Sequence, residues 1–145
     1  MQYTNLGNHY VIRLVPGEDV GESLLLFCKK EKIASAYFTM IGACRDVELA
    51  HYNLEQQKYT TKVFSSPTEV ASLTGNIALY DGSRIVHMHG VFSDETMAAH
   101  GGHIMKAVIH AAGEIFLTPY DTTIEKHFDK ETGLKLMKLD CTLIK

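Results

Sequence analysis

The sequence predicts a domain made mainly of β-strands with one packed helix. One segment, after Pro16-Gly17, has both the start signal and the spacing of an amphipathic helix. Most of the chain that follows consists of short apolar runs rich in β-branched residues, which is typical of strands. The Asp81-Gly82 pair separates two of these runs and is a hairpin signal, so the strands on either side are expected to pair antiparallel.

The elements follow in a clear order along the chain. A first strand is expected at 9–14. A helix follows it, with Asp19 as N-cap, Glu22 three residues later and one apolar face formed by Val20, Leu24, Phe27 and Cys28. Further strands are expected at 35–41, 47–53, 59–64, 69–80, 84–92, 114–118 and 136–144. Residues 103–112 fit a helical stripe as well as a strand, and periodicity leaves both open.

The chain has 145 residues, of which 46% are hydrophobic, so we expect a single domain over 1–145 with a real core. The net charge is −3, which argues against binding to phosphate backbones because nucleic-acid binders usually carry a clustered basic face. The sequence contains no apolar run of membrane-spanning length, and its first residues, Met1-Gln2-Tyr3-Thr4-Asn5, lack the basic and apolar regions expected of a secretory leader. We therefore expect a cytoplasmic protein without membrane contact.

Two histidine-bearing segments carry the most specific chemistry in the chain. In Val86-His87-Met88-His89-Gly90 the neighbours are apolar, which predicts a strand buried on both faces. Residues i and i+2 of a strand point to the same side, so His87 and His89 are expected side by side. A metal ion is one way to satisfy two imidazoles in such a place.

A third imidazole is expected from Gly101-Gly102-His103, where the glycines let the backbone turn tightly and approach another strand. His100 is a competing donor. Three histidines without a fourth protein ligand describe an open zinc site, in which water or substrate completes the tetrahedron. The alternative is that His87 and His89 are hydrogen-bonded core or interface histidines without a metal.

The three cysteines, Cys28, Cys44 and Cys141, lack the spacing of a redox or zinc motif. We expect buried, reduced thiols. A nucleophilic role for Cys44 is the alternative, but a cysteine that continues an apolar run usually belongs to a core.

Several motifs in order resemble the plants-and-prokaryotes conserved (PPC) domain family. They are Ser72-Leu73-Thr74-Gly75-Asn76-Ile77, His87-Met88-His89-Gly90-Val91-Phe92-Ser93-Asp94, Gly101-Gly102-His103 and Glu114-Ile115. The resemblance runs from about His9 to Leu143. It implies an α+β fold with a large, mainly antiparallel sheet and one packed helix, assembled as a homotrimer. It also favours a strand after His103.

The resemblance also implies a site. Some stand-alone prokaryotic members hold a metal through three histidines at positions that match His87, His89 and His103. Glu69 and Glu114 fit motif positions as well. A carboxylate beside such a metal could orient an imidazole or move a proton, which makes Glu114 a catalytic candidate.

The chain departs from the plant members of the family in two ways. It contains no Arg-Gly-Arg-Pro hook, and Ser66-Pro67-Thr68-Glu69-Val70 replaces a Gly-Arg-Phe-Glu-Ile type of segment. Without the hook, the inserted arginines that bind a minor groove are missing. Direct, specific binding to nucleic acid is therefore not expected.

Three functions follow as hypotheses. The first is a trimeric interaction module that holds a divalent metal, with zinc expected, and binds a small molecule or a protein partner at the metal site. The second is a zinc-dependent enzyme that acts on a small molecule through metal-bound water. The third is a DNA-associated, transcription-linked role that works through partner proteins. The sequence names no substrate, because phosphate-binding loops, nucleotide fingerprints and Ser-His-Asp patterns are all missing from it.

Overall fold

A computed structural model describes residues 1–139, which form nine β-strands and one α-helix. The elements in chain order are β1 (Gln2–Asn5), β2 (Tyr10–Leu14), α1 (Val20–Lys30), β3 (Ala36–Asn53), β4 (Lys58–Phe64), β5 (Thr68–Tyr80), β6 (Ser83–Ser93), β7 (Ala99–Pro119), β8 (Glu125–Asp129) and β9 (Leu134–Met137). This confirms the α+β class with a mainly antiparallel sheet.

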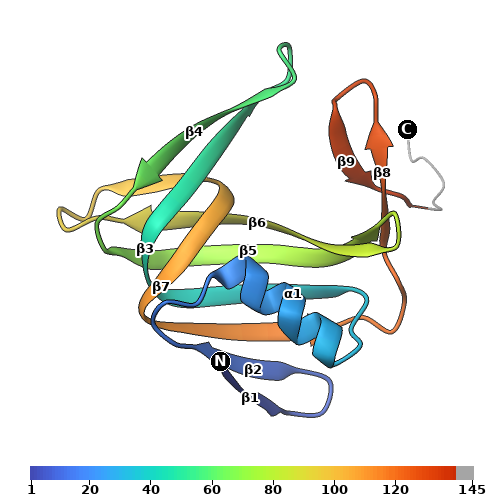
Figure 1. Ribbon diagram of the computed structural model, residues 1–145, viewed down its shortest axis with the longest axis horizontal. Helices are drawn as coiled ribbons and strands as arrows, with labels where there is room; N and C mark the ends of the chain where they lie inside the picture. The colour runs from blue at the N-terminus through green and yellow to red at the C-terminus, as the bar shows by residue number, and fades with distance from the viewer. Residues whose placement is uncertain (140–145) are drawn as a thin grey trace, which may run out of the picture.

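All the strands belong to one sheet, in which the long strands β3 and β7 lie side by side and run through most of the molecule (Figure 1). β3 also pairs with β4 and β5, and β6 pairs with both β5 and β7. Within residues 1–139, every pairing is antiparallel except that of β5 with β8. The short strand β1 and the strand β8 were not predicted from the sequence.

β3 is one bent strand rather than the two separate strands expected at 35–41 and 47–53. The bend lies at Gly42, whose φ is +145°. A Cβ atom there would lie 2.2 Å from the carbonyl oxygen of Ala112, so only glycine fits. β3 shifts its register against β7 between Gly42 and Cys44. A strand that bends at bulges keeps pairing with its neighbour on both sides of the bend. The separate apolar runs in the sequence do not reveal this continuity.

β7 resolves the ambiguity of residues 103–112 in favour of a strand, continuous with the one expected at 114–118. The register against β3 shifts between Glu48 and Leu49, where β7 contains an extra residue. The extra residue puts Ile104 and Ala107 in the core although they are three positions apart. A bulged strand therefore reproduces the spacing of a helical stripe.

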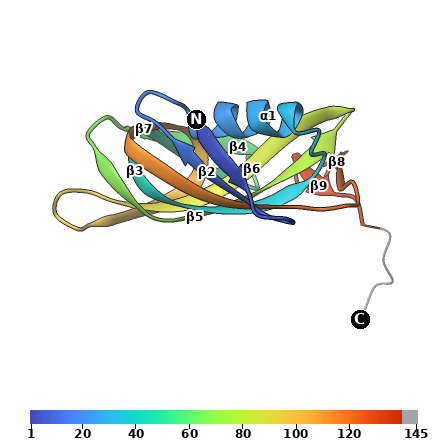
Figure 2. The same cartoon turned by 90° about the horizontal axis from the view of Figure 1, so that it is seen from below.

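The helix α1 begins as expected, because the Asp19 side chain accepts a hydrogen bond from the Glu22 backbone N–H at 3.0 Å. Figure 2 shows α1 lying against one face of the sheet. Its buried residues join the core with alternate residues of the strands, among them Phe38, Met40 and Ile115. The core therefore lies between the helix and this face.

The opposite face of the sheet carries exposed apolar side chains. Tyr37 and Ile41 of β3 are 46% and 55% exposed, and Phe116 of β7, which pairs with Thr39, is 56% exposed. They alternate with the core residues Phe38 and Met40 and so point away from α1. One chain alone leaves this face uncovered.

The predicted hairpin at Asp81-Gly82 is confirmed, since both residues have positive φ and join antiparallel β5 and β6. The histidine strand β6 is not buried on both faces as expected: Met88 and Phe92 are buried, whereas His89 and Val91 are exposed. The strand expected at 136–144 corresponds to β9, which begins two residues earlier, at Leu134, and ends at Met137. Cys141 and the rest of the predicted strand over 140–144 lie outside the described residues.

No helix in the described range is both long and apolar enough to cross a membrane.

Candidate metal centre

The structure brings His87, His89 and His103 together. His87 and His89 share one face of β6, and His103 of β7 pairs in register with His89. The Nε2 atoms of His87 and His89 lie 3.2 Å apart, and His103 Nδ1 lies 3.4 Å from His89 Nε2. One nitrogen from each ring lies within 4.8 Å of the others.

This spacing fits a tetrahedral divalent metal. Zinc binds imidazole nitrogen at about 2.0–2.1 Å, which places two ligand nitrogens of a tetrahedron roughly 3.3 Å apart. The nitrogen–nitrogen distances from His89 to His87 and to His103 are both close to that value. The donor set also fits, because neutral imidazole is a common ligand of zinc and other late divalent ions. Ligation itself stays a prediction.

The triad lies where two strands separate. The His89–His103 pair is the last one of the β6–β7 ladder, and from His103 onward β7 pairs instead with β3 at Ala50 and Leu49. The side chain of His87 therefore has no β7 residue directly beside it. The fork between β6 and β7 holds the three rings in one place.

Small residues let the backbones approach at this fork. A Cβ atom at Gly102 would lie 3.0 Å from the Ala50 carbonyl oxygen, and one at Gly75 of β5 would lie 2.5 Å from the His87 carbonyl oxygen. The predicted close approach at the glycine pair is therefore confirmed, but the predicted tight turn is wrong. Gly101 and Gly102 are extended residues of β7, because the chain has already reversed in the loop before Ala99.

Burial favours the neutral form of two imidazoles of the triad, His87 and His103. Burial lowers the pKa of His87 to about 4, with further lowering by the charges of Lys126, His103 and His89. The pKa of His103 is also lowered, first by burial and then by His89 and Lys126. Neutral imidazoles offer their lone pairs to a metal without first losing a proton.

A pocket of about 430 Å³ opens beside the triad. His87 and His103 form one part of its wall, and Lys126 and Lys135 of the β8–β9 hairpin form another. Tyr59 of β4 also lines it, with its ring centroid 5.4 Å from that of His103. Burial lowers the pKa of Lys126, and the nearby Lys135 lowers it further.

Sequence analysis missed Tyr59 and Lys126, because neither belongs to a motif and both reach the site through long-range strand pairing. It also missed Asn76, which is paired with His87 across β5 and β6. The buried Oδ1 atom of Asn76 has no hydrogen-bond partner among residues 1–139.

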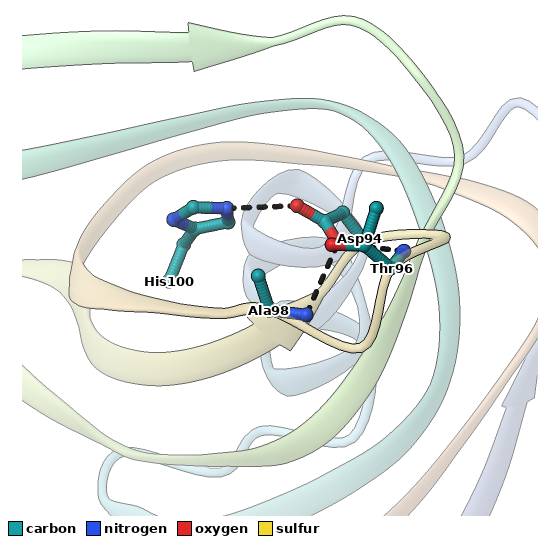
Figure 3. Close-up of polar contacts among 4 residues, drawn as sticks. All are labelled: Asp94, Thr96, Ala98 and His100. Carbon is teal, nitrogen blue, oxygen red and sulfur yellow. Dashed lines mark hydrogen bonds and ion pairs between the residues drawn. The ribbon is translucent and has the colours of Figure 1, made fainter.

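His100 does not compete for the metal position. It lies three residues before His103 and therefore on the other face of β7. Its Nε2 atom is 3.1 Å from Asp94 Oδ2, and its ring stacks on Phe64 with centroids 4.7 Å apart. Figure 3 shows the same Asp94 carboxylate accepting hydrogen bonds from the backbone of Thr96 and Ala98. His100 thus completes the turn between β6 and β7.

The other candidates also lie apart from the triad. Glu69 and Glu114 line a separate hollow beside the bend in β3, together with Ala111 and Ala112. Cys28 and Cys44 are buried free thiols, as expected. Burial raises their pKa values to about 11 and about 12, which keeps both thiols protonated and argues against a nucleophilic Cys44.

In the metal-free protein, we expect acid to reduce stability through His87. Its folded pKa of about 4 lies below the value near 6.5 of an unfolded chain, so the unfolded state binds more protons between these values. The free energy of unfolding therefore rises with pH in this window and is lost as pH falls through it. Urea unfolding between about pH 4 and 7 should show a smaller pH dependence in His87→Gln than in the wild type. The matched change at exposed His110 should keep the wild-type slope, and an equal slope in His87→Gln would contradict the assignment.

Comparison with known proteins identifies relatives of this fold. No curated protein matches the chain. A candidate DNA-binding protein from Bacteroides thetaiotaomicron is 27% identical, with a TM-score of 0.91 over 94% of this chain and 96% of that one. A metal-containing protein from Archaeoglobus fulgidus is 28% identical, with a TM-score of 0.85 over 96% of this chain and 99% of that one.

A plant- and prokaryote-conserved (PPC) protein from Pyrococcus horikoshii is 30% identical, with a TM-score of 0.87 over 98% of this chain and 97% of that one. The family model of the Plants and Prokaryotes Conserved domain, abbreviated PCC or PPC, matches residues 1–121. This range contains all three histidines of the triad. The chain therefore belongs to the Plants and Prokaryotes Conserved domain family.

Proposed function

We propose that this protein is a metal-dependent binding module. His87, His89 and His103 hold one divalent ion, and a small molecule or a protein partner binds at its open side. The observation that carries this proposal is the group of three imidazoles, with one nitrogen of each within 4.8 Å of the others, beside a pocket of about 430 Å³. The description of the Archaeoglobus fulgidus relative as a metal-containing protein supports it.

Zinc is the ion we propose, because imidazole nitrogens and a tetrahedral spacing suit it, although copper, nickel and iron accept the same donors. When bound at an open site, zinc supplies a Lewis acid that attracts anionic or polar groups. The chain contributes the three ligands and a pocket wall that orients the bound molecule.

Zinc-dependent catalysis is the second candidate, and the pocket beside the triad favours it. Catalysis at such a site usually needs a group that moves a proton. In the described part of the chain, the metal-ligand cluster contains no carboxylate, and Glu114 lies elsewhere. Burial and the neighbouring Tyr52 raise the pKa of Tyr59, which keeps that side chain protonated. Binding is therefore the function that these residues support best.

We also propose that the module is a homotrimer. The support for it is the uncovered sheet face with Tyr37, Ile41 and Phe116 exposed, since apolar patches of this kind commonly mark interfaces. His89 and Val91 are exposed on β6 beside this face. Assembly through it would place the metal centre near the subunit boundary.

The metal proposal is tested by elemental analysis. We expect about one divalent ion per chain in the wild type, because three pre-arranged imidazoles bind without ordering cost. His87→Ala and His103→Ala should carry close to none. His51→Ala, a matched change at an exposed histidine of β3, should keep the wild-type content. Equally low metal in all four proteins would contradict the proposal.

The trimer is tested by light scattering with a matched pair of variants. We expect the wild type to show a mass near three chains of 16.2 kDa each. Phe116→Lys should shift the protein toward the monomer, since it places a charge on the uncovered face. Phe128→Lys on β8, where the side chain is similarly exposed at 53%, should leave the mass unchanged. A monomeric wild type at micromolar concentration would overturn the proposal.

A DNA-linked role is a further candidate, favoured by the description of the Bacteroides thetaiotaomicron relative as a candidate DNA-binding protein. With a net charge of −3, we expect such a role to need a partner protein, because affinity for phosphates grows with the number of cations placed along them. In a gel-shift assay at about 150 mM salt, the protein alone should not retain duplex DNA selectively. Tight, sequence-selective retention would instead favour direct DNA binding.

A further inference from the structure

The side chain of Lys126 is largely buried at the edge of the pocket, and the described residues give it no anionic partner. Its side chain is 9% exposed and lines the pocket beside His87 and His103. Among residues 1–139, its ammonium group makes no hydrogen bond or ion pair. Buried lysines are rare unless they are paired, because removing the charge from water costs several kcal/mol. A group that occupies the pocket is the natural partner for this charge.

The rest of the pocket has the character of a site for a small organic anion. Its charged side chains are both lysines, Lys126 and Lys135, and the described lining contains no carboxylate. Lys135 rests over the Tyr80 ring, with its Nζ 4.3 Å from the ring centroid. Ile85, Leu134 and Leu136 add apolar surface. The volume of about 430 Å³ falls within the range of small-ligand sites.

The hairpin that carries both lysines is fixed to the rest of the fold at its base and at its tip. At the base, β8 pairs with β5 at Tyr80–Lys126, and the Ile124 backbone N–H donates to Ser35 Oγ at 2.8 Å. At the tip, the Tyr52 hydroxyl donates to the Thr132 carbonyl oxygen at 2.6 Å. Because both ends are held, the hairpin presents a fixed wall to the histidine triad.

This wall lies outside the part of the chain that the family model matches. The model ends at residue 121, whereas Lys126, Leu134 and Leu136 come after it. The triad thus lies in the region that defines the family, and the pocket wall facing it lies beyond that region. Such a division lets the hairpin determine which molecule is bound beside the metal ligands.

We propose that this pocket binds a small carboxylate with a short apolar body, its carboxylate between Lys126 and the histidine triad and its body against Leu134 and Leu136. The inference rests on the metal site proposed above and names the class of its ligand. Phosphate is a poorer match, since the described lining lacks arginine, serine and threonine, and the start of α1 lines a second hollow that meets the triad only at His103.

The test uses full-length protein loaded with Co²⁺, whose visible absorption reports a change at the metal, titrated with acetate, butyrate and hexanoate. We expect the dissociation constant to fall roughly threefold for each added methylene while the apolar wall is being covered. Butyramide should bind at least about tenfold more weakly than butyrate, because it lacks the charge that pairs with Lys126. Inorganic phosphate should bind more weakly than hexanoate.

Two variants of the same hairpin separate the pocket wall from the metal alone. Lys126→Met should weaken butyrate about tenfold and leave Co²⁺ content unchanged, whereas Lys130→Met, at an exposed lysine of the hairpin turn, should bind butyrate like the wild type. Thermal unfolding of Lys126→Met in the absence of carboxylate should occur at or above the wild-type temperature, because a buried charge has been removed.

The outcomes distinguish the two proposals. Suppose that Co²⁺ loading is normal but carboxylate affinity depends neither on chain length nor on Lys126. Carboxylates would then bind to the metal alone, which would overturn the proposed carboxylate pocket and leave the proposed metal centre intact. Tighter binding of phosphate than of every carboxylate would also overturn it. Loss of metal from the wild type would overturn both.

Discussion

The separation of β7 from β6 after the His89–His103 pair is the constraint on which the site depends. An antiparallel ladder continued by two residues would place Met105 opposite His87 and fill the space beside that ring. Instead, β7 turns to pair with Ala50 and Leu49 of β3. The fork therefore performs two tasks at once: it fixes the three imidazoles by strand register, and it leaves room for a pocket where a fourth ligand would otherwise be a side chain.

This arrangement costs stability, and the core must offset it. Imidazoles in a tight group leave ring nitrogens poorly paired, and the burial of most of the Lys126 side chain beside them adds a further desolvation cost. Both costs would be relieved by the same event, in which a cation binds between the rings and an anion binds beside the lysine. The core under α1, with Phe27, Phe38 and Leu117 fully buried, supplies the apolar burial that offsets these costs.

Features of the fold that depend on residues close together in the sequence were predictable from it. The helix start at Asp19, the hairpin at Asp81-Gly82 and the shared face of His87 and His89 all follow from local geometry. His103 was predictable because glycines precede it and because the ordered motifs resemble a known family. The continuity of β3 and β7 was not predictable, since their bulges change the spacing of buried residues without a distinctive residue pattern.

Lys126 shows why the proposed ligand class could not be predicted together with the candidate metal ligands. His87 and His89 are two residues apart, so strand periodicity alone places them together. Lys126 reaches them only because β8 pairs parallel with the end of β5, a contact that has no local signal. Its neighbours in the sequence read as a polar, solvated segment, and its burial appears only when the β8–β9 hairpin closes over the fork. A candidate metal site can thus be encoded in a short motif, while the selectivity proposed beside it depends on a tertiary contact that leaves no motif of its own.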